Sequence, residues 1–391
     1  MTRKLPGSRI ACGQLKATFS NVASLLEASV RPASNNSAFK ISQVIHGASW
    51  RNHKLNNQDG FNQECCNCRC KFREPSPISD THNLIDLQAT GRIGQHIFQA
   101  LVARGTFCVT VLTRTNNLAQ AHAGVDVKTV DYDEPASVVD ALKGQEALVI
   151  TMANTAPDTQ QLVLVKAAAD AGVRWILPNE WGSDTAHPYN QRAGVYRNKQ
   201  AVRDLIDELR VSSWVAVVSN QWFEMSLSTG RYGIDINRRK VTFFDDGTAK
   251  TTTTTKLQVG RAVASLLSLP EDGSSPALSD FAHRHIYISS FLLSQRDMLG
   301  AVQRNTNSSP HQWITQSVSL KAALDSTYQA LRQGDHAAAL EWISASNFAP
   351  GSGSDYAATR ETANKVLGLP EEDLDEATRR AIREAHLLSK K

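Results

Sequence analysis

From residue 83 onward, short apolar segments rich in β-branched residues alternate with stretches of helical periodicity. In one such stretch Ile93, Ile97 and Leu101 recur four residues apart, which places them on one face of a helix that ends near Gly105. The pattern predicts strands at 83–87, 107–114, 126–132, 147–153 and 173–178, with helices at 136–144 and 159–172. Apolar strands that alternate with helices at this spacing are typical of a parallel sheet covered on both faces. The predicted fold class is therefore α/β, with a doubly wound parallel sheet.

The sequence beyond this alternation predicts a smaller α+β part at the C-terminus. A helix at 196–210 and a buried strand at 214–223 lead into it. Within it the pattern predicts strands at 240–247, at the threonine run 251–255 and at 284–290, and helices at 256–270, 355–368 and 371–388. We therefore expect a main α/β domain at 81–220 and a substrate subdomain with C-terminal helices at 221–391.

The segment "QATGRIG", residues 88–94, follows the first predicted strand and opens the first predicted helix. Gly91 and Gly94 stand at the second and third glycine positions of a GxxGxxG spacing, and Gln88 occupies the first. Such glycines let the backbone turn sharply and approach a pyrophosphate, which lies at the positive end of the helix. The context predicts a Rossmann dinucleotide site at 81–220. Its predicted cofactor-binding residues in this turn are Gln88, Thr90, Gly91, Arg92, Ile93 and Gly94.

The end of the second strand distinguishes between the two nicotinamide cofactors. A site for NAD usually carries Asp or Glu there, whereas a site for NADP uses a cation for the 2′-phosphate. Here Thr113 and Arg114 occupy the position, and a guanidinium suits a phosphate dianion. The predicted cofactor is therefore NADP(H), with a solvated arginine as the alternative interpretation. Met152 and Ala153, after the fourth strand, are expected to lie near the cofactor.

The first 80 residues differ in composition from the rest of the chain. They are rich in Asn, Ser and Arg and end in a Pro/Ser stretch that indicates a linker, so we expect a disordered or unrelated extension. Glu27 is the first acidic residue and follows several cations, which leaves a mitochondrial presequence as an alternative to a cytoplasmic protein. A translated intron or a wrongly assigned start is a third interpretation. The crowded cluster "CCNCRC", residues 65–70, lacks the second ligand pair of a zinc site, so no metal is predicted.

Charge and hydropathy narrow the class of partners. The total net charge is +4, of which residues 1–80 carry +6 and the rest of the chain −2. The rest of the chain is therefore close to neutral and does not predict nucleic-acid binding. No apolar run reaches the length of about 18 residues that a membrane helix needs. The predicted partner is a small-molecule substrate, with a homodimer or a protein partner left open.

Several motifs in the same order resemble one known family. They are "ATGRIGQHIFQALVARG", "VTVLTR", "VRWILPNEWGSD", "YRNKQAVRDLI" and "SNQWFEMSL". Together they resemble the NmrA-like and isoflavone-reductase-like branch of the atypical short-chain dehydrogenases/reductases, particularly its fungal members. The resemblance runs from about residue 83 to the C-terminus. It implies a Rossmann domain that binds NADPH and a smaller C-terminal subdomain over the substrate.

The resemblance also implies a reaction and a catalytic residue. Reductases of this family deliver hydride to an activated carbon of a phenolic compound, and their catalytic lysine corresponds here to Lys199. A lysine beside a nicotinamide acts as a general acid/base or stabilises developing negative charge; an exposed helix lysine is the alternative. Tyr196 lies three residues before Lys199, so a pair on one helix face is left open although the usual Tyr-x-x-x-Lys motif is absent.

Substrate-lining residues are expected where strands end. Asn179, Glu180 and Trp181 follow the fifth strand at the carboxyl edge of the sheet, where ligands bind in open α/β folds, with capping of the strand and packing of the subdomain as the alternative. Trp222 and Phe223 would form an aromatic wall for a flat substrate, with core packing as the alternative.

Three residues depart from the family pattern: Gln88, Asp86 in a strand that should be buried, and Gln258 in place of the usual acidic residue. Two functions therefore remain. The first is an NADPH-dependent reductase of aromatic or secondary-metabolism compounds, and the second is a non-catalytic NAD(P)-sensing regulator of the NmrA type.

Overall fold

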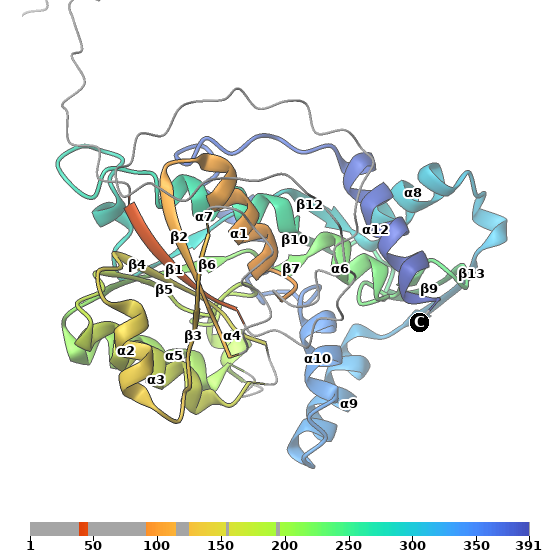
Figure 1. The fold of residues 1–391 in the computed structure, drawn as a ribbon. Coiled ribbons are helices and arrows are strands. Elements are labelled where there is room, and N and C mark those ends of the chain that lie inside the picture. Colours follow the sequence, from red (N-terminus) through yellow and green to blue (C-terminus); the bar gives the residue numbers. More distant parts are fainter. Residues whose placement is uncertain (1–38, 46–90, 115–124, 154–155, 193–195, 391) are drawn as a thin grey trace, which may run out of the picture. The chain divides into compact units, whose positions relative to one another are not determined.

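Seven parallel strands form the central sheet of the computed structural model, which describes residues 39–45, 91–114, 125–153, 156–192 and 196–390 (Figure 1). The strands, in order across the sheet, are β11 (Arg284–Tyr287), β6 (Ser213–Val218), β5 (Trp175–Leu177), β4 (Ala147–Thr151), β1 (Phe39–Ile45), β2 (Phe107–Thr113) and β3 (Asp126–Thr129). The predicted α/β class with a Rossmann-type sheet is confirmed.

Helices cover both faces of this sheet. Successive strand residues point to opposite sides, so each face carries its own apolar cluster. Ala147 and Val149 of β4 pack in one apolar cluster with α1 (Gly94–Arg104) and α7 (Lys256–Leu266). Leu148 and Ile150 pack in a second cluster on the other face. The helices of the second face are α2 (Pro135–Leu142), α3 (Asp158–Asp170) and α5 (Arg197–Leu209).

The position of the first strand corrects the sequence-based prediction. β1 pairs on one side with β2 and on the other with β4, so residues 39–45 occupy the central place expected for 83–87. Residues 83–87, with Asp86, lie outside the described part of the chain. The segment 1–80 is therefore not wholly an extension, because it supplies the central strand. The sequence favours 83–87 because, in a dinucleotide fold, the first strand normally leads directly into the glycine turn.

The C-terminal part contains two three-stranded sheets and a third apolar cluster. The sheets are β12 (Phe291–Ser294), β10 (Lys250–Thr254) and β7 (Gln221–Trp222), and β13 (Ile314–Val318), β9 (Lys240–Phe244) and β8 (Ile234–Asp235). Its helices are α6 (Phe223–Ser228), α8 (Gln295–Thr306), α9 (Leu320–Arg332), α10 (Ala338–Ser346), α11 (Tyr356–Thr359) and α12 (Leu374–Leu388), and the short helix α4 (Pro188–Gln191) precedes α5. Two 3-10 helices cover Leu278–Phe281 and Pro310–Gln312.

Two predictions for this part need correction. β11 and α7 belong to the central sheet and its helical layer, so the segment after residue 220 is not a separate subdomain throughout. The helix predicted at 355–368 covers only α11, and Asp355 precedes it without a side-chain cap. The threonine run does form a strand, and Thr255 at its end caps α7 by accepting a hydrogen bond from the Gln258 amide.

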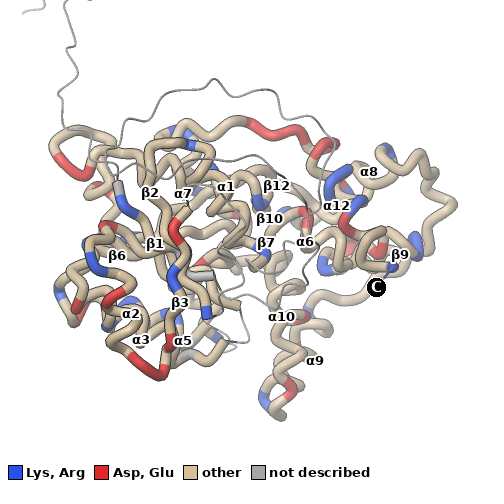
Figure 2. The backbone as a smooth tube through the Cα atoms, in the orientation of Figure 1, with Lys and Arg blue, Asp and Glu red and all other residues tan. Residues whose placement is uncertain are grey.

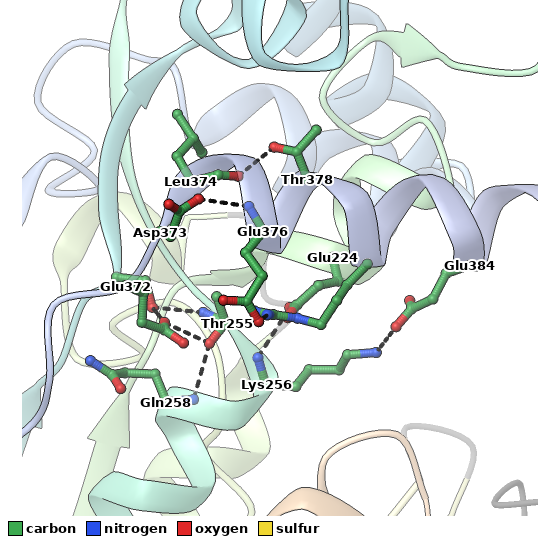
Figure 3. Close-up of polar contacts among 12 residues, drawn as sticks. Glu224, Thr255, Lys256, Gln258, Glu372, Asp373, Leu374, Glu376, Thr378 and Glu384 are labelled. Carbon is green, nitrogen blue, oxygen red and sulfur yellow. Dashed lines mark hydrogen bonds and ion pairs between the residues drawn. The ribbon is translucent and has the colours of Figure 1, made fainter. Parts of the chain in front are cut away.

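The chain that leads into α12 is bound to the start of α7 (Figure 3). Glu372 accepts a hydrogen bond of 2.7 Å from the Thr255 hydroxyl, and the Lys256 Nζ donates to Glu384 of α12 at 2.5 Å. The Gln258 side chain donates to the Pro370 carbonyl at 2.8 Å, which an ionised carboxylate at this position could not do. These contacts hold the C-terminal segment against the helical layer that contains α1.

Charges of both signs are distributed over the described residues, with an acidic run just before α12 (Figure 2). No helix in this part of the chain is long and apolar enough to cross a membrane. A cluster of three or more metal-ligating side chains is likewise not found among the described residues, and the cysteines at 65–70 lie outside them.

Gly260 sets the distance between α7 and α1. A Cβ at this position would lie 2.3 Å from the His96 carbonyl oxygen of α1. We expect Gly260→Ala to lower the free energy of unfolding by about 1–3 kcal/mol, because backbone cannot yield as a flexible side chain does. Chemical denaturation measures this change. Gly300, inside α8, has only a side-chain atom of Arg304 near such a Cβ, at 3.7 Å, so Gly300→Ala should instead stabilise by about 0.5–1 kcal/mol. Equal effects of the two substitutions would contradict this interpretation.

Candidate active site

The glycine turn lies at the carboxyl edge of the central sheet. Ile45 at the end of β1 pairs with Thr151 at the end of β4, so both strands end at the same edge. Gly91 has φ +72°, and a Cβ there would lie 3.7 Å from the Thr151 carbonyl oxygen. The left-handed conformation favours glycine and lets the turn cross close to the strand ends. Gln88 and Thr90, predicted for the same turn, lie outside the described residues.

The start of α1 suits an anion. Gly94 opens the helix behind Ile93, and among the described residues no side chain caps this end and no acidic residue lies in its first turn. The positive end of the helix dipole therefore meets no competing carboxylate here. Arg92 in the turn is exposed, with its Nη1 3.3 Å from the Met225 sulfur. These residues fit a dinucleotide phosphate.

Thr113 and Arg114 lie at the end of β2, beside the end of β1. Thr113 is buried, whereas Arg114 is exposed and forms no ion pair among the described residues. The cation is thus available at the position that distinguishes the two cofactors.

A cavity of about 170 Å³ opens next to this edge and contains most of the predicted substrate-side residues. Its volume is of the order that holds a single aromatic ring. The predicted residues that line it are Ile93, Met152, Asn179, Glu180, Trp181, Tyr196, Lys199 and Trp222. Residues that line it without having been predicted are Gly182, Ser183, Thr185, Asn220, Gln221, Met225, Ser226, Arg231, Leu340 and Ile343. Leu340 and Ile343 come from α10. No local sequence pattern predicts that this helix packs over the cavity.

Lys199 reaches the cavity from the first turn of α5. Its Nζ donates a hydrogen bond to the Asn179 carbonyl oxygen. Asn179 is itself fixed, because its amide donates to Gln161 at 2.9 Å and its side chain donates to the Met152 carbonyl at 3.1 Å. The lysine is therefore oriented by the loop after β5, which is hydrogen-bonded to the end of β4.

Glu180 and Arg203 form a buried ion pair directly beside this loop. Their side chains are 3% and 2% exposed, and Thr185 also donates to the carboxylate. Burial raises the pKa of Glu180, but His285 at 3.6 Å, the Arg203 charge and Thr185 together hold that pKa below its ordinary value. Glu180 thus anchors α5 to the loop after β5, and its role is positional. Arg203 compensates its charge.

The remaining aromatic candidates separate into cavity and core. Tyr196 precedes α5 and lines the cavity; burial raises the pKa of its hydroxyl, while a hydrogen bond with Ser183 acts in the opposite direction. Trp222 also lines the cavity. Phe223, predicted for the same wall, is fully buried and packs edge-on against Phe291 at 5.3 Å, so it belongs to the C-terminal core. The chain enters α6 at Phe223, which turns its side chain away from that of its neighbour.

Comparisons with known proteins show what the chain is similar to. A family model described as NAD(P)H-binding matches residues 89–270. Oxidoreductase aprR of Aspergillus flavus is 28% identical over 302 residues, which cover 76% of this chain and 97% of the relative. Oxidoreductase poxI of Penicillium oxalicum is 25% identical over 319 residues, covering 79% and 96%.

Solved structures share the fold. An isoflavone reductase superposes with a TM-score of 0.59 at 17% identity, over 74% of this chain and 96% of the other. A triphenylmethane reductase of Citrobacter sp. complexed with NADP(H) gives 0.55 at 17% identity, over 74% and 97%.

The chain thus contains an NAD(P)H-binding domain of the Rossmann class, and its relatives are oxidoreductases. The resemblance predicted from the motifs is confirmed by the NAD(P)H-binding model and the fungal oxidoreductases and, for the fold, by isoflavone reductase.

Proposed function

We propose that the protein is an NADPH-dependent reductase of a small aromatic or phenolic compound of secondary metabolism, with Lys199 as its catalytic residue. The observation that carries the proposal is the presence of Lys199 in a cavity next to the glycine turn, walled by Trp181 and Trp222. Aromatic side chains with a few oriented polar groups are typical of small-molecule sites.

NADP(H) is preferred to NAD(H) in this proposal because Arg114, and no carboxylate, ends β2. Gly91, Gly94 and Arg114 would hold the phosphates. Bound NADPH supplies a hydride. Lys199 either exchanges a proton with a substrate oxygen or holds negative charge on that oxygen. Asn179 keeps the ammonium in place through its carbonyl oxygen.

A titration of NADPH and NADH against protein fluorescence, followed by NADPH oxidation with a panel of phenolic enones and quinones, tests the proposal. We expect tighter binding of NADPH and turnover of at least one compound. Tight binding without oxidation by any compound would instead favour the regulatory function. Failure to bind either cofactor would overturn both.

The sequence between the end of β1 and the start of α1 leads to a prediction for cofactor affinity. His46-Gly47-Ala48 follows β1, and Thr90-Gly91 precedes α1. Joining Ala48 to Thr90 gives "HGATGRIG", with glycine at all three positions of the spacing. Deleting residues 49–89 should therefore leave a folded protein that binds NADPH at least as tightly as the parent, because this spacing suits the phosphate turn.

Fluorescence titration and thermal unfolding of the deletion variant measure both properties. Gly47→Val within this variant should weaken NADPH binding, whereas Gln88→Gly in the full chain should not strengthen it. A deletion variant that fails to bind NADPH, or a clear gain from Gln88→Gly, would assign the first glycine position to residue 88 instead.

A further inference from the structure

Arg231 places a positive charge in the cavity that the proposed reaction does not use. The residue follows α6, lines the cavity and is half-buried. Among the described residues its guanidinium has no carboxylate within ion-pair distance. Burial and the nearby positive charge of Arg92 both lower its pKa. A partly desolvated cation without a partner is unfavourable, so the site is arranged to receive an anion.

The acidic residues close to the cavity do not compensate this charge. Glu180 is the one carboxylate among the described lining residues, and Arg203 already neutralises it. Glu224, on α6, points toward α12, where it contacts Arg380 at 3.2 Å and accepts from the Lys256 amide (Figure 3). The carboxylates among the described lining residues therefore leave Arg231 uncompensated.

Trp222 adds an unsatisfied donor to the same wall. Its indole Nε1 is buried and has no acceptor among the described residues. Buried N–H groups in folded proteins nearly always have an acceptor, so a ligand oxygen is expected at this position. The indole ring and the guanidinium thus share one cavity, with an apolar surface supplied by Met225 and Ile343.

We propose that the substrate is an aromatic acid whose carboxylate is held by Arg231, with Trp222 donating to one of its oxygens. This inference rests on the proposed function only in taking the cavity as the substrate site. The cofactor phosphates are the other possible source of an anion, since Arg92 of the glycine turn lies close enough to affect Arg231.

Equilibrium binding of p-coumarate and of its methyl ester, in the presence of NADPH, tests the proposal without requiring turnover. The parent should bind the acid about 10–100-fold more tightly than the ester, because an arginine–carboxylate contact is charge-assisted. Arg231→Met and Arg231→Gln should abolish this preference and leave the Kd for NADPH unchanged. The exposed Arg238 provides the matched control, and Arg238→Met should retain the preference.

Equal binding of acid and ester by the parent would overturn the proposal. So would a higher Kd for NADPH in both Arg231 variants with the acid preference retained, which would assign the anion to the cofactor. If the preference holds and depends on Arg231 but no compound oxidises NADPH, the inference stands and the reductase function fails.

Discussion

Lys199→Met is expected to lower kcat for the reduction of an accepted substrate by about 10²–10⁴-fold, with the Kd for NADPH unchanged. The methionine retains the length and apolar stem of the side chain but removes the ammonium that now donates to the Asn179 carbonyl. Steady-state kinetics under saturating NADPH measure the loss. Lys166, exposed on α3, provides the control, and Lys166→Met should leave kcat unchanged.

Lys199→Arg separates the two roles open to this lysine. Arginine keeps the positive charge but does not give up a proton near neutral pH. Substantial activity in Lys199→Arg would favour electrostatic stabilisation, and loss comparable to that of Lys199→Met would favour proton transfer. If Lys199→Met retains parental kcat, Lys199 is not the catalytic residue.

The fold was largely predictable because its strands are strongly apolar. β2, β4 and β6 are buried almost throughout. β2 and β4 lie within segments predicted as strands, and β6 begins one residue before the predicted strand at 214–223 and ends earlier. β1 was missed because "FKISQVI" is less apolar and lies 48 residues before α1, far beyond the few residues that usually separate these elements. Only its pairing with β2 and β4 identifies it as the central strand.

The site was predictable where strands end and unpredictable where distant elements converge. Asn179, Trp181 and Lys199 follow from the sheet edge and from the family resemblance, and all line the cavity. Arg231 carries no local signal, because its importance depends on the absence of a nearby carboxylate. The pairing of Arg203 with Glu180 joins residues 23 apart and needs the relative placement of α5 and β5.

Arg203→Met is expected to lower the free energy of unfolding by about 3–5 kcal/mol, because it leaves the Glu180 carboxylate buried without its cation. Chemical denaturation at pH 7 measures this loss. The double variant Arg203→Met/Glu180→Gln should lose less than the sum of the single variants, since no charge remains unpaired. Arg238→Met, which breaks the exposed pair with Asp235, should change stability by less than about 1 kcal/mol.

The same pair predicts a dependence of stability on pH. The folded-state pKa of Glu180 lies below the ordinary value of 4.5, so its contribution to stability is present above pH 4.5 and is lost as the pH falls through the folded-state pKa. The double variant lacks this carboxylate. Its free energy of unfolding should therefore decline less than that of the parent as the pH falls below 5. Parallel pH profiles for parent and double variant, or a loss below about 1 kcal/mol for Arg203→Met, would show that the pair does not anchor α5 to the loop that orients Lys199.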